Sequence, residues 1–349
     1  MLITKRLRAH LAPHRRSIVA FGVFDGLHRG HRALIGLLTA RARRRRAVSV
    51  VLTFEPHPQS VLGRRPWPMI LTTLAEKEAL LAGMGVDVLG IIRFSARTAA
   101  TDPAAFVRRI LVDRLAATEV ICGEDCGFGK DRGGDLRLLR SLGDDAGFTV
   151  TALRPLANRA GKVSSTGIRR DLLAGELAAA NRVLGRPYRL LGTIVPGYGI
   201  GRTLGYPTAN IRLDDAAKLV PADGVYAAAA AIGGRRYSGM LYIGNRPTFG
   251  GARRQIEFHA FGARGRLTGR RIAVDLLKYL RPDRAFADAK QLRDAIAADQ
   301  RRIERYFRRR AAGRGGPAAL DSCPARRYNC STAQPLGPGN QITIDIAKT

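Results

Sequence analysis

A glycine-punctuated turn between an apolar run and an amphipathic segment constrains the fold of this chain more than any other feature. The run Ser17–Ala20 leads into Phe21-Gly-Val-Phe-Asp-Gly-Leu-His-Arg-Gly-His31, and Arg32–Leu38 follows with helical spacing. This order predicts a buried strand, a turn and the start of a helix. Unpaired backbone N–H groups and the helix dipole attract phosphate at such a start. Because Gly30 lets a phosphate approach the backbone closely, the sequence indicates a nucleotide-handling site.

Segments typical of strands and of helices alternate from Ser17 to about Val183. The strand-like segments are continuous apolar runs, and they lie at residues 17–20, 48–53, 86–92, 119–122 and 148–152. Apolar runs separated by helices predict a doubly wound parallel sheet that is covered on both faces. We expect this α/β domain to occupy residues 1–184.

A different pattern begins after Leu184, where glycine and proline turns separate short strand-like runs. These runs lie at residues 188–195, 225–231, 237–243, 255–261 and 271–280. Short strands at such spacing predict a small antiparallel β-barrel. With a closing helix from about residue 287 to 307, this second domain would occupy residues 185–307. The aperiodic remainder, 308–349, has a Gly/Pro-rich start and is expected to be mostly disordered.

The chain carries a net charge of +31 over its 349 residues, which favours nonspecific attraction to polyanions. Its arginines are spread along the whole chain and aromatic residues make up only 6%, so we do not expect specific nucleic-acid binding. No apolar run reaches the roughly 18 residues that span a bilayer, and the N-terminus has no secretory core. We therefore expect a cytoplasmic protein without a membrane partner, and the sequence leaves a homo-oligomer open.

Two further patterns have plain structural interpretations. The arginine-rich run 41–46 falls at the end of the first expected helix, where cations complement the dipole, and we interpret it as a solvated helix end. The cysteines at positions 122, 126, 323 and 330 have no C-x-x-C spacing, which favours free thiols over a zinc site.

The polar residues around the expected helix starts are candidates for phosphate chemistry. His28 and His31 can donate imidazole N–H bonds to phosphoryl oxygens, which positions the reactants and stabilises developing charge. The run 164–166, Ser-Ser-Thr, either caps the next helix or helps to bind an anion. Arg169 then lies in the first turn of that helix and faces the same end. The loop 123–135 follows a strand, so it belongs at the carboxyl edge of the sheet, where ligands of such folds bind.

Three polar residues stand out in the second half. Thr208 and Asn210 are two apart, so on a strand they face the same way. A hydroxyl and an amide oxygen on one face suit Mg²⁺ and phosphate. Glu257 lies in an otherwise apolar strand, where a carboxylate is costly unless it has a role, and we interpret it as a general base.

The order of these motifs resembles one family, the bacterial bifunctional riboflavin kinases/FMN adenylyltransferases (FAD synthetases). The resemblance covers most of residues 15–307 and rests on stretches 21–31, 53–58, 71–77, 123–133, 164–169, 201–210, 221–226 and 243–249. Any one of them is modest evidence, whereas their shared order is specific.

For the first domain the resemblance implies transfer of the AMP part of ATP to FMN, which gives FAD and pyrophosphate. It implies contacts of His28 and His31 with the ATP phosphates, and a nucleotide site that also includes Gly22, Phe24, Asp25, Gly30, Ser164, Ser165, Thr166 and Arg169. It implies flavin contacts for Asp125, Phe128 and Arg132, and for Asn181 it implies a contact with either the flavin or the second domain.

For the second domain the resemblance implies phosphorylation of riboflavin by ATP, which gives FMN. Glu257 would take the proton of the ribityl hydroxyl, Gly201 and Thr208 would contact ATP, and Thr208 and Asn210 would hold Mg²⁺. Riboflavin, FMN and ATP are thus the expected small-molecule partners.

The chain departs from the family pattern at two places. It has Cys126-Gly127 where the family shows an aromatic residue and often an arginine, and it lacks the usual acidic residue and tyrosine in the segment 262–269. Two alternatives therefore stay open: a divergent relative with only one of the two activities, and a basic nucleic-acid-binding protein on the same scaffold.

Overall fold

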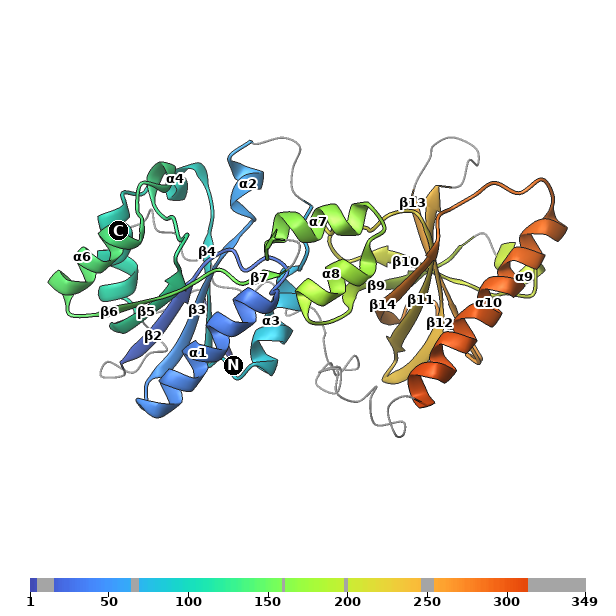
Figure 1. Ribbon diagram of the computed structural model, residues 1–349, viewed down its shortest axis with the longest axis horizontal. Helices are drawn as coiled ribbons and strands as arrows, with labels where there is room; N and C mark the ends of the chain where they lie inside the picture. The colour runs from blue at the N-terminus through green and yellow to red at the C-terminus, as the bar shows by residue number, and fades with distance from the viewer. Residues whose placement is uncertain (5–15, 64–68, 159–160, 198–199, 246–253, 313–349) are drawn as a thin grey trace. The chain divides into compact units, whose positions relative to one another are not determined.

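The computed structural model describes residues 1–4, 16–63, 69–158, 161–197, 200–245 and 254–312 (Figure 1). The chain divides into two compact units, of which the first runs from Met1 to Ser164 and the second begins at Ser165. Among the described helices, none is both long and apolar enough to cross a membrane.

The first unit is built on a parallel sheet (Figure 1). Its strands, within the described residues, follow the order β1-β4-β3-β2-β5-β6, and every neighbouring pair is parallel. The strands are β1 Leu2–Thr4, β2 Ser17–Phe21, β3 Val48–Glu55, β4 Val88–Arg93, β5 Ala117–Gly123 and β6 Thr149–Leu153. The sequence runs predict five of them; β1 is an additional edge strand that pairs with β4.

Helices cover both faces of this sheet, which confirms the doubly wound α/β fold. Side chains alternate along β2, so Val19 and Phe21 join the core under α5, η2 and α6, whereas Ile18 and Ala20 join the core under α1 and α3. The helical elements are α1 Arg29–Arg44, α2 Pro58–Val61, α3 Leu74–Gly83, α4 Ala96–Ala99, α5 Pro103–Phe106, the π-helical η2 Val107–Val112, the 3₁₀ turn η3 Lys130–Arg132 and α6 Leu136–Ala146. A small hairpin of β7 Ala157–Asn158 and β8 Gly161–Lys162 follows.

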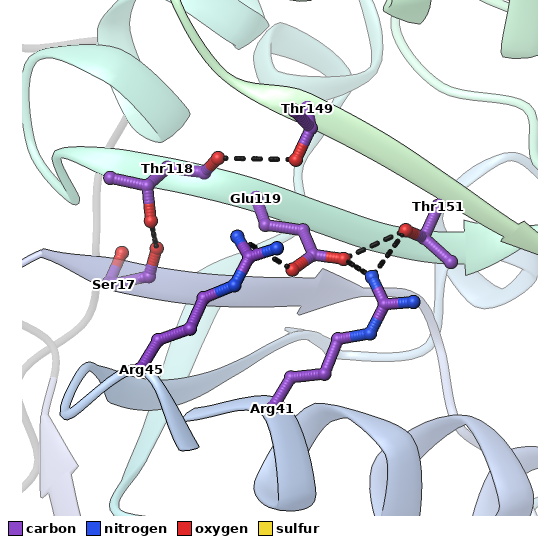
Figure 2. A network of polar contacts seen from close by, with 7 residues as sticks. All are labelled: Ser17, Arg41, Arg45, Thr118, Glu119, Thr149 and Thr151. Carbon is purple, nitrogen blue, oxygen red and sulfur yellow. Dashed lines mark hydrogen bonds and ion pairs between the residues drawn. The ribbon is translucent and has the colours of Figure 1, made fainter. Parts of the chain in front are cut away.

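A buried carboxylate explains part of the arginine run at the end of α1. Glu119 on β5 is fully buried and contacts the guanidinium of Arg41, while Thr151 donates to its Oε1 at 2.8 Å (Figure 2). Arg45 Nη1 lies 3.2 Å from Oε2, close enough for an ion pair, although this contact lacks hydrogen-bond alignment. The interpretation of this run as a merely solvated helix end was wrong for Arg41 and Arg45, because a buried negative charge requires nearby cations.

The second unit contains a closed antiparallel barrel, as expected, in the order β10-β13-β12-β11-β14-β9 (Figure 1). Its strands are β9 Tyr188–Val195, β10 Ala209–Leu213, β11 Gly224–Ile232, β12 Arg235–Asn245, β13 Arg254–Ala260 and β14 Arg271–Arg281, with the short α9 Ile200–Thr203 between β9 and β10. The helix α10, Ala289–Ala312, buries Ile303 against Val225, Ala227 and Met240. It continues five residues into the expected disordered tail, and residues 313–349 lie outside the described part of the chain.

Two helices precede the barrel in this unit, α7 Ser165–Leu173 and α8 Leu177–Leu184. Asn181 on α8 donates to the carbonyl of Leu276 at 2.9 Å and accepts from the N–H of Tyr188 at 2.7 Å, so its amide ties α8 to β14 and β9. The second compact unit therefore includes residues 165–184, which the sequence assigns to the first domain. A functional boundary at residue 184 stays a prediction.

Candidate active sites

The turn between β2 and α1 brings together most of the residues that the sequence assigns to the first site. His28 is the N-cap of α1, and its Nδ1 accepts from the N–H of His31 at 3.3 Å. The two imidazoles stack with their centroids 3.7 Å apart and 15° between their planes. Phe24 packs edge-on against His31. The histidine pair thus lies at the first turn of a sixteen-residue helix, where backbone N–H groups and the dipole favour an anion.

Two glycines make room for this arrangement. A β-carbon on Gly30 would come within 3.2 Å of the His28 imidazole, and one on Gly22 would come within 3.3 Å of the Phe24 ring. Both contacts are tighter than most side chains tolerate, so each glycine allows a ring to lie against the backbone. This gives Gly22 and Gly30 a role in shaping the turn.

Burial determines the protonation state of His31. Burial has the largest effect on the pKa of His31, and the neighbouring His28 and Lys77 act in the same direction. Together they hold this pKa well below its ordinary value. The imidazole is therefore neutral at neutral pH. Its buried Nδ1 has no hydrogen-bond partner among the described residues. An orphaned ring nitrogen beside a helix N-terminus is a group that a bound ligand can satisfy.

Asp25, another predicted nucleotide residue, has a structural task in this turn. Its buried carboxylate accepts from the N–H of Leu71 at 2.9 Å and from the N–H of Thr72 at 3.0 Å. These bonds fasten the β2–α1 turn to the segment before α3, where Thr73 and Glu76 form a capping box. Asp25 thereby positions the turn that carries the histidines.

The predicted flavin residues do not form one cluster. In the loop after β5, Asp125 and Arg132 are exposed, and Arg132 Nη2 lies 3.4 Å from the Asp125 carbonyl. Phe128 is only 6% exposed and packs edge-on against Phe21 in the core. This leaves little of its surface for a ligand. Asn181 lies on α8, where its amide donates one hydrogen bond to the barrel backbone and accepts one from it.

The departure at Cys126 places a thiol against the core beneath this loop. Cys126 is half-buried and shares a sulfur hydrogen bond with buried Cys122. This bond lowers the pKa of Cys126, and together with burial it raises the pKa of Cys122. Cys126 is therefore the more reactive thiol of the two. Both are free, and the other two cysteines lie outside the described residues.

The serine and arginine motif spans the boundary between the two compact units along the chain. Ser164 is the last residue of the first unit, and Ser165, Thr166 and Arg169 lie in the first turns of α7. Ser164, Ser165 and Arg169 are half-buried, whereas Thr166 is exposed. Their expected contacts with a triphosphate stay predictions.

The barrel brings Thr208, Asn210 and Glu257 together. Asn210 on β10 is directly opposite Glu257 on β13, and Thr208 donates from its hydroxyl to Glu257 Oε2 at 2.8 Å. Glu257 is only 5% exposed. A β-carbon on Gly197 would overlap the Asn210 amide, and one on Gly201 would meet the Tyr206 carbonyl and come within 3.1 Å of the Thr208 hydroxyl, so both positions favour glycine. The result is a hydroxyl, an amide and a carboxylate on one patch of the barrel wall.

A pocket of about 770 Å³ opens beside this group. Thr208 and Asn210 line it together with Val195, Arg266 and Thr268, among others. The segment that departs from the family pattern, 262–269, thus supplies part of the wall. A pocket of this size accommodates a nucleotide or a flavin.

Sequence reasoning missed two polar residues that the structure places beside these sites. Lys77 on α3 is buried, and its Nζ donates to the Val23 carbonyl and to Thr53. His259 contacts the carbonyl of Pro207 through Nδ1 at 2.7 Å, next to Thr208. Thr73 and Glu76 cap the start of α3, yet nothing in the sequence shows that the side chain of Lys77 points inward. No group of three or more histidine, cysteine or acidic residues among the described positions could hold a metal.

A parallel-sheet unit with a histidine pair at a helix start, followed by a barrel with a buried acid beside a pocket, is the architecture of a two-unit nucleotide-handling protein. Residues 10–167 match the FAD synthetase family model, and residues 184–307 match the riboflavin kinase family model. The chain belongs to the bifunctional riboflavin kinase/FMN adenylyltransferase family.

Curated relatives and a solved structure agree with this assignment. A bifunctional riboflavin kinase/FMN adenylyltransferase of Escherichia coli K12 is 37% identical over 297 residues, covering 85% of this chain and 94% of the relative. The protein of the same description from Bacillus subtilis 168 is 34% identical, with coverages of 84% and 93%. A Streptococcus pneumoniae crystal structure, described as a macrolide-efflux protein, superposes with a TM-score of 0.78 at 30% identity, covering 87% of this chain and 98% of that one. These likenesses favour the bifunctional enzyme over the alternatives left open by the sequence.

Proposed function

We propose that this chain makes FAD from riboflavin in two ATP-dependent steps. Riboflavin is phosphorylated to FMN at the barrel, and FMN is adenylylated to FAD at the β2–α1 turn of the parallel-sheet unit. Membership of the family supports both steps. The assignment of each reaction to residues rests on two local contacts. In the first unit His28 stacks on His31, and in the barrel Thr208 donates a hydrogen bond to Glu257.

In the adenylyl transfer, an FMN phosphate oxygen attacks the α-phosphorus of ATP, and the bond to the β-phosphate oxygen breaks to release pyrophosphate. The phosphate is already a nucleophile, so the protein needs to orient the two substrates and stabilise the developing charge. The N–H groups at the start of α1 and the imidazoles of His28 and His31 are suited to this task. Because His31 is neutral, it offers one N–H donor and adds no positive charge of its own.

In the phosphoryl transfer, Glu257 accepts the proton of the terminal ribityl hydroxyl while that oxygen attacks the γ-phosphorus, and ADP leaves. The Thr208 hydroxyl orients this carboxylate through the 2.8 Å hydrogen bond. The pocket beside Thr208 and Asn210 would hold the ATP phosphates and the flavin.

Magnesium fits the residues on the barrel wall. The hydroxyl of Thr208 and the amide oxygen of Asn210 are hard oxygen donors, and the carboxylate of Glu257 lies beside them. Mg²⁺, when bound, neutralises charge on the ATP phosphates.

We also propose that the enzyme acts in the cytoplasm.

The test is a time course with purified protein, riboflavin, ATP and Mg²⁺, in which the flavins are separated by chromatography. FMN should rise first and then give way to FAD. FMN alone would limit the function to the kinase and would point to the loop at Cys126. FAD from supplied FMN, with riboflavin unchanged, would limit it to the adenylyltransferase and would point to the segment 262–269.

A further inference from the structure

Lys77 is a buried cation whose ammonium contacts the turn that carries the histidine pair. The residue is 4% exposed, and its Nζ donates to the Val23 carbonyl at 2.8 Å and to Thr53 Oγ1 at 2.9 Å. The Thr53 hydroxyl also lies 3.1 Å from the Val23 carbonyl. Three groups from α3, β3 and the β2–α1 turn thus meet at one point. Burying an ammonium is costly, so its presence here calls for a function.

We propose that Lys77 is a positioning residue for adenylyl transfer, whose buried ammonium ties the β2–α1 turn to α3 and β3 and so holds His28 and His31 in place. The proposal rests on the proposed function of the first unit.

The backbone of the turn shows why it needs such a tie. Phe24 and Leu27 have φ values of 49° and 39°, a left-handed conformation that side chains other than glycine adopt only where the surroundings enforce it. Asp25 fastens one side of the turn to the segment before α3, and Lys77 fastens Val23 to α3 itself. Phe24, the residue after Val23, is the one that packs against His31.

The charge of Lys77 acts on the same histidine. Among the described residues, the charged or titratable groups that act on His31 are His28 and Lys77, and both lower its pKa in addition to the larger effect of burial. Lys77 itself faces the carboxylates of Asp25, Glu55 and Glu78, which partly offset the lowering of its own pKa by burial. A cation at this place therefore favours the neutral imidazole, which is the state with one N–H donor and one acceptor.

The decisive variant is Lys77→Met, which keeps most of the side-chain volume and removes the charge and the donors. Thr53 can still donate to the Val23 carbonyl in this variant, so one of the contacts to the turn survives. We expect the kcat of FMN adenylylation to fall on the order of 100-fold, because small displacements of catalytic groups cost that much. The rate of FMN adenylylation should fall at low pH as His31 becomes protonated. In Lys77→Met this acid limb of the pH profile should move to higher pH, because removal of a nearby cation raises the pKa of His31. Amide hydrogen exchange in β2 and β3 reports that the first unit is folded, and riboflavin phosphorylation by the same sample reports that the barrel is folded.

One further variant separates the loss of the charge from the loss of a contact to the turn, and a second is a surface control. Thr53→Val removes one partner of Lys77 and keeps the cation, so it should leave the acid limb unchanged. Lys290→Met removes an exposed lysine from α10 and should change neither activity nor the profile. If Lys77→Met lowers activity without any shift of the acid limb, Lys77 is merely structural and the proposal fails.

NMR titration of the His31 imidazole in the substrate-free protein separates this proposal from the proposed function. The resonance is assigned by its loss in His31→Gln. In Lys77→Met, His31 should become protonated at higher pH than in the wild type, whether or not the protein adenylylates FMN. If the wild type makes no FAD but this shift appears, the proposed function fails, whereas the effect of Lys77 on the histidine pair holds. Identical titrations in both proteins would overturn the proposal.

Discussion

Replacing Arg41 by alanine should loosen the parallel sheet at β5. Arg41 is the main partner of the fully buried carboxylate of Glu119 (Figure 2). The side chain of Arg41 is 27% exposed, whereas that of Arg45 is 44% exposed. Removing one partner of a buried ion pair costs about 3–5 kcal/mol. Because Arg45 remains nearby and water reaches this end of the sheet, we expect about 2–3 kcal/mol for Arg41→Ala. Arg45→Ala should cost less than about 1 kcal/mol.

Amide hydrogen exchange is the appropriate assay, because the chain has two compact units and a single unfolding transition would mix them. In Arg41→Ala, the amides of β5 and its neighbour β2 should exchange roughly 30- to 150-fold faster, which corresponds to this loss in opening free energy. Arg44→Ala, at an exposed position on the same helix, controls for the change in helix surface. Equal exchange in the Arg41 and Arg44 variants, or equal effects of Arg41 and Arg45, would refute this account of the buried carboxylate.

Two further predictions concern the barrel and the loop after β5. Thr208→Val should slow FMN formation about 10-fold or more, because Glu257 loses a hydrogen bond worth roughly 1.5–3 kcal/mol. Thr208→Ser keeps the hydroxyl and should retain most of the activity. Equal rates in the two variants would contradict the role of Thr208 in orienting Glu257. A brief alkylation should modify Cys126 before Cys122, as site-resolved mass spectrometry would show. Cys126 is half-buried and its pKa is lowered, whereas Cys122 is buried and its pKa is raised. Preferential labelling of Cys122 would contradict the assigned contact between the two thiols.

The local order of elements could be predicted because it depends on short-range patterns. The apolar run at Ser17–Ala20 and the glycines after it are enough to predict β2, its turn and the start of α1. The glycine and proline turns after Leu184 likewise predict the short strands of the barrel. Thr208 and Asn210 could be placed on one patch because strand spacing fixes which way neighbouring side chains face.

The remainder depends on contacts between residues distant in sequence. Glu119 and Arg41 are 78 positions apart, so the arginine run alone could not show that it serves a buried acid. The flavin contact that the resemblance implies for Phe128 stays a prediction, and the sequence could not show that this ring packs against Phe21 in the core. Asn181 assigns α8 to the barrel through bonds to backbone groups, which leave no pattern in the sequence. Lys77 escaped notice for the same reason.

We expect the two steps to use separate polar centres, one at His31 and one at Glu257. His31→Ala should convert riboflavin to FMN and stop there, whereas Glu257→Ala should leave riboflavin unchanged and convert supplied FMN to FAD. The most direct measurement mixes the two variants in equal amounts with riboflavin, ATP and Mg²⁺ and follows the flavins by chromatography. We expect the mixture to make FAD, because the FMN released by one variant is the substrate of the other. Two results would show that the centres do not work independently. Either both variants keep their single activities but the mixture makes no FAD, or one substitution removes both activities in a folded protein.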